Sequence, residues 1–143
     1  MIFKTARFAD LDTTTLYRLL KLRVDVFVVE QECAYPELDG RDTEAGTLHV
    51  WAERDGEITG YLRILDDGPQ ARIGRVLTAK TARGGGLGAR LMEQALQAIG
   101  DRPSVLDAQS HLIQFYERFG YVQSGPSYVE DGIPHTPMQR SAR

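Results

Sequence analysis

A glycine-rich run stands directly between a strand-like segment and an amphipathic helix, and no other stretch restricts the fold as strongly. The run reads Thr81-Ala82-Arg83-Gly84-Gly85-Gly86-Leu87-Gly88-Ala89-Arg90. A glycine-rich turn that opens a helix leaves several backbone N–H groups unpaired and directed at one point, and the helix dipole adds to their attraction for an anion. We therefore expect this turn to hold a phosphate group.

The segments on both sides of the run predict a strand–helix–strand crossover. Residues 71–78 have strand patterning, and apolar residues on one face predict a helix from Leu87 to Ile99 with Gly100 as its C-cap. Residues 104–108 are typical of a short buried strand. The two strands are expected to lie parallel, because a helix between them carries the chain back to its starting end.

Hairpins and two further helices surround this crossover. A weak strand pattern covers 2–8. A helix capped at Asp12 is predicted over 13–29, with its end left open because residues 26–29 are mostly β-branched. Residues 30–47 have loop composition with several acidic side chains. Strand alternation over 48–53 and 58–65 flanks Asp55-Gly56, a dipeptide typical of hairpin turns.

The C-terminal part supplies the remaining elements. A helix over 110–119 is predicted to end at Gly120, and residues 121–140 are predicted to form a hairpin around Asp131-Gly132. The resulting order is β-α-β-β-β-α-β-α-β-β. It predicts an α/β (α+β) fold: a central, mixed, mostly antiparallel sheet with one parallel crossover and flanking helices.

Length and composition exclude several classes of protein. With 143 residues, 42% hydrophobic and 26% charged, the chain is expected to form a single domain over residues 1–143. The net charge of -3 argues against nucleic-acid and anionic-membrane partners. No apolar run approaches the ~18 residues of a membrane span. The N-terminus lacks a signal-peptide core, which favours a cytoplasmic location.

Cysteine and histidine usage argues against disulfide and metal chemistry. Cys33 is the one cysteine, so neither an intrachain disulfide nor a cysteine-based zinc site can form. A loop or core position suits Cys33 better than the role of a nucleophile. The spacing of His49, His111 and His135 matches no metal site, and we predict no metal ion.

Two phosphate-binding motifs fit the glycine run incompletely. A P-loop is excluded because no Lys-Ser or Lys-Thr pair follows the glycines. Gly84-x-Gly86-x-x-Ala89 matches a dinucleotide fingerprint, with Asp107 near the ~20-residue offset expected of a ribose-binding acid. Only one crossover is predicted, however, and the chain is short for both a dinucleotide and a substrate domain. A Rossmann-like dinucleotide binder is therefore kept as an alternative.

A third motif is accompanied by several blocks in a matching order. Arg83-x-x-Gly86-x-Gly88 resembles the Q/R-x-x-G-x-G/A motif of the GNAT N-acetyltransferase superfamily, in which a strand also ends five residues earlier, here at Thr78. The run Gln114-Phe115-Tyr116-Glu117-Arg118-Phe119-Gly120-Tyr121 is similar to the family's late block. Residues 128–132 and Met138 resemble its closing hairpin. The resemblance covers most of the chain.

A narrower resemblance is to the ElaA-like branch of this superfamily. It rests on Arg23-Val24-Asp25-Val26-Phe27-Val28-Val29-Glu30-Gln31, Glu37-Leu38-Asp39-Gly40 and Asp131-Gly132-Ile133-Pro134-His135. The piece Arg23-x-x-Val26-Phe27-x-x-Glu30 is also similar to acyl-homoserine-lactone synthases, which share the fold and are usually longer.

The resemblance implies an acyl-CoA-dependent N-acyltransferase. Acetyl-CoA would be the cosubstrate, attacked directly by a primary amine in a ternary complex. Backbone groups near Val76, Leu77 and Thr78 would pair with the pantetheine arm at a gap in the sheet, and Gln109 would contact the same arm in place of the family's usual Asn. The pyrophosphate would be held by the backbone amides of Arg83, Gly84, Gly85, Gly86, Leu87, Gly88 and Ala89.

Proton transfer has one candidate acid and several candidate bases. Tyr116 matches the family's tyrosine that protonates the departing thiolate, and a phenol is protonated at neutral pH. The alternative is that its ring only packs within the helix. The candidate bases are Glu30, His111 and His135, and a chain of waters is a further route.

The acceptor site is the least defined part of this interpretation. His49, Trp51 and Tyr61 lie on predicted strands and either face a site or pack in the sheet. Acidic residues within 30–44 favour a cationic small-molecule or peptide amine, unless they only keep a loop solvated. A CoA-binding or regulatory module without efficient turnover is the competing class. The fold is often dimeric, and the sequence leaves a homodimer open.

Overall fold

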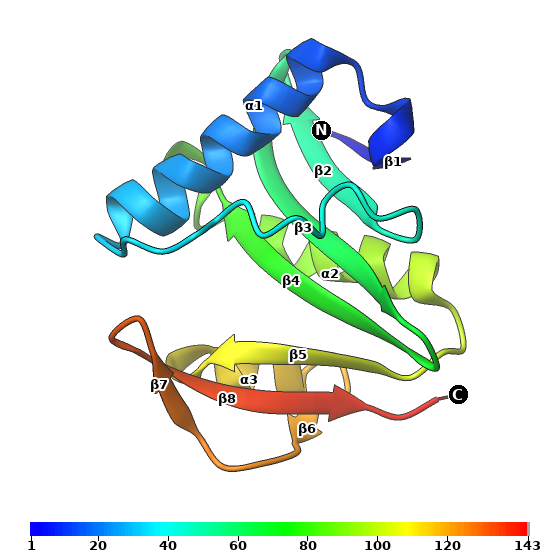
Figure 1. Cartoon of the computed structure of the whole chain (residues 1–143), viewed down its shortest axis with the longest axis vertical. Coiled ribbons are helices and arrows are strands. Elements are labelled where there is room, and N and C mark those ends of the chain that lie inside the picture. The colour runs from blue at the N-terminus through cyan, green and yellow to red at the C-terminus, as the bar shows by residue number, and fades with distance from the viewer. Residues whose placement is uncertain (143) are drawn as a thin grey trace.

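The strands form one mixed sheet in the order β1-β2-β3-β4-β5-β8-β6, with β7 paired to β8 (Figure 1). The computed structural model describes residues 1–142. All neighbouring strands are antiparallel except β4 and β5, which lie parallel as predicted. The strands are β1 (Ile2–Arg7), β2 (Leu48–Arg54), β3 (Glu57–Asp67), β4 (Gln70–Thr78), β5 (Ser104–Gln109), β6 (Val122–Gln123), β7 (Tyr128–Glu130) and β8 (Ile133–Arg140).

The first helix confirms the prediction over 13–29 and changes form along its length. It begins as α1 (Thr13–Arg23), where the Asp12 side chain accepts a hydrogen bond of 2.7 Å from the Thr15 amide. It continues as a π-helix, Val24–Glu30. Insertions of this wider form into α-helices are often found at functional sites. The widened turns lie at the β-branched residues that left the helix end open in the sequence.

The remaining helices follow the crossover. Helix α2 (Leu87–Ile99) has the predicted bounds and ends at Gly100, whose φ is +67°. The helix predicted over 110–119 was too long: a 3-10 turn (Ser110–Leu112) precedes α3 (Ile113–Glu117). Leu112 leaves the helical region with a φ of -107° and a ψ of 9°, which separates the two pieces. None of the helices described in residues 1–142 combines the length and the apolar composition that a membrane crossing requires.

The sheet separates two apolar cores. Helix α1 lies on one face of the sheet, and α2 and α3 lie on the other (Figure 1). On the α1 face, Leu19 and Val26 pack with three side chains of the sheet, Trp51, Tyr61 and Leu77. On the other face, the core includes Val50, Leu62, Ile64, Ile73, Leu87, Leu91, Met92, Ala95, Leu106, Tyr116 and Met138. Alternation along β2 and β3 sends successive side chains into the two cores.

Strands β4 and β5 pair only at their N-terminal ends. The paired positions are Ala71 with Ser104 and Arg72 with Val105, and beyond them the two strands diverge (Figure 1). A bulge in β4 accompanies the divergence, because the register with β3 shifts between Tyr61 and Arg63. Arg75 lies in this bulge with a φ of +55°, which a non-glycine residue adopts at a cost. The sheet is therefore open in its middle.

Gly60 allows α2 to pack closely on β3. A Cβ atom at this position would lie 2.7 Å from Leu91 Cδ1 and 3.1 Å from Leu87 Cδ2. We expect Gly60→Ala to lower the free energy of unfolding by about 1–3 kcal/mol, because a packed core resists an added methyl group. Urea unfolding measures the change. Gly85→Ala is the control, since a Cβ atom there meets nothing within 4 Å and stability should be unaltered. Equal stability of the two variants would contradict the packing explanation.

Candidate active site

The open middle of the sheet forms a groove of about 960 Å³. Its walls come from both halves of the split sheet, from the π-helix and from the loop that follows it. The predicted site residues that line it are Glu30, Val76, Leu77, Thr78, Arg83, Gln109, His111, Tyr116 and His135. The structure therefore brings together all four predicted pantetheine contacts, the candidate acid and the three candidate bases.

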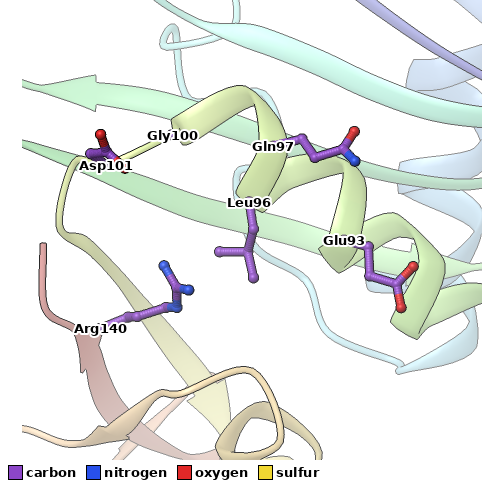
Figure 2. Close-up of a pocket in the computed structure, with 6 residues that line it drawn as sticks. All are labelled: Glu93, Leu96, Gln97, Gly100, Asp101 and Arg140. Carbon is purple, nitrogen blue, oxygen red and sulfur yellow. The ribbon is translucent and has the colours of Figure 1, made fainter. Parts of the chain in front are cut away.

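A second hollow of about 520 Å³ holds none of the predicted site residues. Figure 2 shows it at the C-terminal end of α2, with Arg140 of β8 opposite Leu96. The Arg140 Nε donates a hydrogen bond of 2.8 Å to the Phe119 carbonyl oxygen, which gives this side chain a structural role. The groove in the split sheet is therefore the candidate active site.

The glycine run begins just beyond Arg83, outside the groove lining. Gly84 and Gly86 have φ values of +90° and +77°, conformations that glycine adopts without steric cost. Gly86 is the N-cap of α2 and no side chain caps the helix. A Cβ atom on Gly84, Gly85 or Gly86 would meet nothing within 4 Å. The first-turn amides of α2 thus face open space, an arrangement that suits a phosphate group.

The Arg83 side chain turns away from these glycines. Its Nη2 atom lies 3.0 Å from Glu30 Oε1 and 3.1 Å from the Thr78 carbonyl oxygen. The hydrogen bond from Arg83 lowers the pKa of the Glu30 carboxyl. The pair joins the end of the π-helix to the end of β4 at the open side of the groove. Any contribution of Arg83 to a phosphate would come from its backbone N–H.

Tyr116 combines a packed ring with a free hydroxyl group. Its ring makes edge contacts with Phe115 and Tyr121, at centroid distances of 5.0 Å and 6.4 Å. Within residues 1–142, the Tyr116 hydroxyl has no hydrogen-bond partner. It is not among the fully buried side-chain atoms that lack a partner, since Arg63 Nε is the one such atom in these residues. The hydroxyl is therefore accessible from the groove. Burial raises the pKa of Tyr116 to about 12, so the phenol is protonated at neutral pH.

Gln109, His111 and His135 line the groove on the side of β5 and β8. Gln109 Nε2 donates a hydrogen bond of 3.4 Å to Gln31 Oε1. His135 lies opposite Gln109 in the β5–β8 register, and its Nδ1 is 2.8 Å from the Ile133 carbonyl oxygen. His111 is exposed on the 3-10 turn before α3. The structure thus places three polar side chains where the two halves of the sheet separate.

An ionic network that is buried at its centre and reaches the groove lies between the first helix, the loop and the sheet. Its members are three arginines and three carboxylates: Arg23, Arg63, Arg75, Glu37, Asp39 and Asp42. Arg23 is only 1% exposed, and its guanidinium lies 2.7 Å from both Glu37 and Asp42. Arg63, Arg75 and Asp39 line the groove itself. One signal in the sequence is Arg63 between Leu62 and Ile64, a cation inside an apolar strand.

This network corrects the interpretation of the acidic loop. Glu37 and Asp42 are buried and paired with arginines, so they neither solvate the loop nor offer free charge to an acceptor. Burial by itself raises the pKa of Asp42, but the hydrogen bonds and charge of Arg23 outweigh this and hold it below its ordinary value. For Asp39, the hydrogen bonds from Arg63 lower the pKa far below the ordinary range.

The remaining candidates of the sequence are structural. The two ring nitrogens of His49 lie 2.7 Å from the Tyr61 hydroxyl and 3.0 Å from the Asp42 carbonyl oxygen, and burial lowers its pKa. Trp51 and Tyr61 pack in the core under α1. Cys33 is buried, and its thiol donates a hydrogen bond of 3.1 Å to the Asp131 carbonyl oxygen.

Comparison with known proteins agrees with this geometry. The family model of the acetyltransferase (GNAT) domain matches residues 21–142. A UPF0039 protein of Mycobacterium tuberculosis is 52% identical over 92% of this chain and 87% of its own length. The crystal structure of Escherichia coli ElaA is 37% identical with a TM-score of 0.93, covering 98% of this chain and 99% of that one.

A further solved structure matches this fold over its full length. It is an acyl-CoA N-acyltransferase from Pseudomonas aeruginosa, 46% identical with a TM-score of 0.94, covering 99% of this chain and 100% of that one. The family match, the three similar proteins and the fold together identify an N-acetyltransferase. The chain therefore belongs to the GNAT acetyltransferase family, in the branch that includes ElaA.

Proposed function

We propose that the protein transfers an acetyl group from acetyl-CoA to a primary amine by direct attack in a ternary complex. The observation that carries the proposal is the free Tyr116 hydroxyl in a groove between β4 and β5, with open helix-start amides beyond the groove's end. The amides at the start of α2 suit a pyrophosphate, and the Tyr116 hydroxyl suits a departing thiolate. A small-molecule or peptide amine would enter from the α1 side.

The proposed cosubstrate contacts divide into two groups. The amides of Arg83 to Ala89 would hold the pyrophosphate, because Gly84, Gly85 and Gly86 leave room for close approach. The backbone of Val76, Leu77 and Thr78, with Gln109 opposite, would hold the pantetheine arm along the unpaired part of β4. The Thr78 carbonyl oxygen already accepts from Arg83, so Val76 and Leu77 are the more accessible partners.

The chemistry balances with one acid and one base. The amine nitrogen forms a bond to the thioester carbonyl carbon, the carbon–sulfur bond breaks, and its electron pair goes to sulfur. Tyr116 hydrogen-bonds and protonates that sulfur. Glu30 and His111, together with His135, are the side-chain candidates for removing the proton from the ammonium form of the acceptor. The net products are an acetamide, free CoA thiol and one proton.

The two alternative functions make different experimental predictions. A Rossmann-like binder would bind NAD, yet only one parallel pair of strands occurs in residues 1–142 and the Asp107 carboxylate pairs with Arg72 at 3.1 Å. Isothermal titration with acetyl-CoA, CoA and NAD distinguishes a dinucleotide binder from a CoA-dependent protein. Release of free thiol across a panel of polyamines, amino acids, aminoglycosides and peptides separates an enzyme from a CoA-binding module. NAD binding without CoA binding would overturn the proposal.

Gly86→Val is expected to weaken acetyl-CoA binding at least about 10-fold, the equivalent of 1.4 kcal/mol. The side chain would occupy the open space before α2 and strain a backbone with a φ of +77°. Gly68→Val is the matched control, because Gly68 has a φ of +78° and equally open surroundings but lies in the β3–β4 turn. Titration of both variants should show a loss only for Gly86. Unaltered affinity of Gly86→Val would argue against the loop as the pyrophosphate site.

A further inference from the structure

We propose that His135 is the general base that removes a proton from the acceptor ammonium group. The proposal rests on the proposed acetyl transfer and selects one of the three side-chain candidates. It is carried by the orientation of the imidazole ring, by its place on the sheet and by the contacts of the other two candidates.

The hydrogen bond of His135 determines which ring nitrogen is basic. Its Nδ1 lies 2.8 Å from the Ile133 carbonyl oxygen. A carbonyl oxygen only accepts hydrogen bonds, so Nδ1 carries the hydrogen and the neutral ring has its lone pair on Nε2. Within residues 1–142, Nε2 has no hydrogen-bond partner and is not among the fully buried atoms that lack one. A lone pair is thus held ready and accessible.

The ring is fixed in the groove by its neighbours. It stacks on Tyr128 of β7 with a centroid distance of 5.7 Å and an interplanar angle of 18°. On the other side, β8 pairs His135 with Gln109, the last residue of β5. The ring is therefore held from β7 and placed at the end of β5 where the sheet opens.

The base and the acid come from opposite faces of the sheet. Thr136 and Met138 alternate with His135 along β8, and Met138 packs in the same core as Tyr116, below α2 and α3. His135 therefore takes the other face, on the side of α1 (Figure 1). This arrangement is compatible with direct transfer, in which the base acts on the attacking nitrogen and the acid on the departing sulfur.

The other two candidates are less suited to this role. Both Glu30 carboxylate oxygens are held by Arg83, and this hydrogen bonding lowers the carboxyl pKa, which makes Glu30 a weaker base. His111 is exposed on a three-residue turn, and none of the described residues makes a side-chain hydrogen bond with its ring. Only His135 combines a defined tautomer, a fixed ring and access to the groove.

All proton transfers of the reaction balance when His135 acts as the base. Nε2 takes one proton from the ammonium group, and the freed nitrogen lone pair attacks the thioester carbon. The carbon–sulfur electron pair goes to sulfur, which takes the Tyr116 hydroxyl proton. The new amide nitrogen returns its extra proton to the Tyr116 oxygen, and the imidazolium releases its proton to solvent. No oxidant or further reactant is needed.

His135→Asn separates the base from the hydrogen bond. The asparagine amide nitrogen can replace Nδ1 as donor to Ile133, while no basic atom replaces Nε2. With an amine that releases thiol from the wild-type enzyme, we expect kcat/KM for the amine to fall about 100-fold at neutral pH. The loss should shrink as the pH rises toward the pKa of the acceptor, because the free amine then needs no base. Acetyl-CoA affinity should stay within about twofold, since His135 belongs to the acceptor face.

The design controls for folding and for other titrating groups. His135→Gln is a second variant without a base, and thermal unfolding measures the stability of both. The ratio of variant to wild-type kcat/KM is followed against pH, so that groups shared by both proteins cancel. The titratable and charged groups around the ring and the groove are Glu30, Cys33, Tyr35, Asp39, Arg63, Arg72, Arg75, Arg83, Asp107, His111, Tyr116, Tyr128, Glu130 and Asp131.

Each other outcome counts against the proposal. Wild-type kcat/KM in two folded variants would overturn it. So would a loss of equal size at every pH, which indicates a positioning role, or the pH-dependent loss appearing in His111→Asn instead. If the wild-type chain releases no thiol with any amine of the panel, the proposed function fails first and this proposal falls with it.

Discussion

Replacing Tyr116 by phenylalanine is expected to lower kcat about 100-fold while acetyl-CoA affinity stays within about twofold. The ring packs against Phe115 and Tyr121, and phenylalanine preserves that packing. The hydroxyl, which makes no hydrogen bond within residues 1–142, is all that is lost. A pKa of about 12 keeps the phenol protonated, so its effect arises as charge develops on sulfur. Stopped-flow detection of free thiol measures the rate.

Tyr121→Phe is the matched control for this experiment. Its hydroxyl lies 2.7 Å from Ser104 Oγ in the core and does not line the groove. Removing it should cost about 1 kcal/mol of stability and leave kcat near the wild-type value. If both variants have the kcat of the wild type, the Tyr116 ring has only a packing role and its hydroxyl is not the acid. If Tyr116→Phe loses acetyl-CoA affinity to the same degree as turnover, its hydroxyl acts in binding.

Arg23→Met is expected to lower the free energy of unfolding by about 3–5 kcal/mol. The Arg23 side chain is 1% exposed and donates to both Glu37 and Asp42. Without it, two carboxylates are left in a buried site with too little positive charge. Urea unfolding at neutral pH measures the loss, and Lys21→Met is the control. Lys21 pairs with Asp25 on the surface, and such a pair contributes at most about 1 kcal/mol.

The pH dependence of the Arg23 effect has a definite sign. The pKa of Asp42 is held below its ordinary value, so the pairing stabilises the fold above the unfolded pKa of about 3.9. This stabilisation is lost as the pH falls through the lower, folded pKa. The difference between wild type and Arg23→Met should therefore shrink in acid. A difference under about 1 kcal/mol at neutral pH would show that the network is energetically dispensable.

The ionic network also connects stability to the shape of the groove. Glu37 accepts hydrogen bonds from Arg23 of the first helix and from Arg75 in the β4 bulge, at 2.7 Å and 2.8 Å. Arg75 has the positive φ of that bulge, where β4 turns away from β5. The paired charges thus hold α1, the loop and the bulge together. A change in this network is expected to affect acceptor binding as well as folding.

Local patterns predicted the elements that depend on local chemistry. Asp55 and Gly56 have φ values of +52° and +79°, as the hairpin turn requires, and α2 has the apolar face and bounds read from its spacing. Gly84 and Gly86 precede α2 with positive φ values, and no side chain caps the start of this helix. Such features depend on residues close in the chain. The resemblance to the family then related these local features to one fold.

Features that depend on distant partners were missed or left open. The sequence leaves the acidic loop open as either a site for a cationic amine or a solvated segment, because the arginines that neutralise it come from α1, β3 and β4. Glu30 appeared free because Arg83 is 53 residues away in sequence. The strand β6 was not predicted because it has only two residues, Val122 and Gln123, whose pairing with β8 creates it.

Apart from β6, the sequence by itself determined the order of the main helices and strands, the glycine-lined helix start and the tyrosine on the last helix. These follow from backbone preferences and from side-chain periodicity, which act over a few residues. Only the tertiary structure decided that β4 and β5 separate, that Glu30 is tied to Arg83, and that His135 has a free Nε2 in the groove. Charge pairing and tautomer choice depend on atoms brought together by folding, and no local pattern contains them.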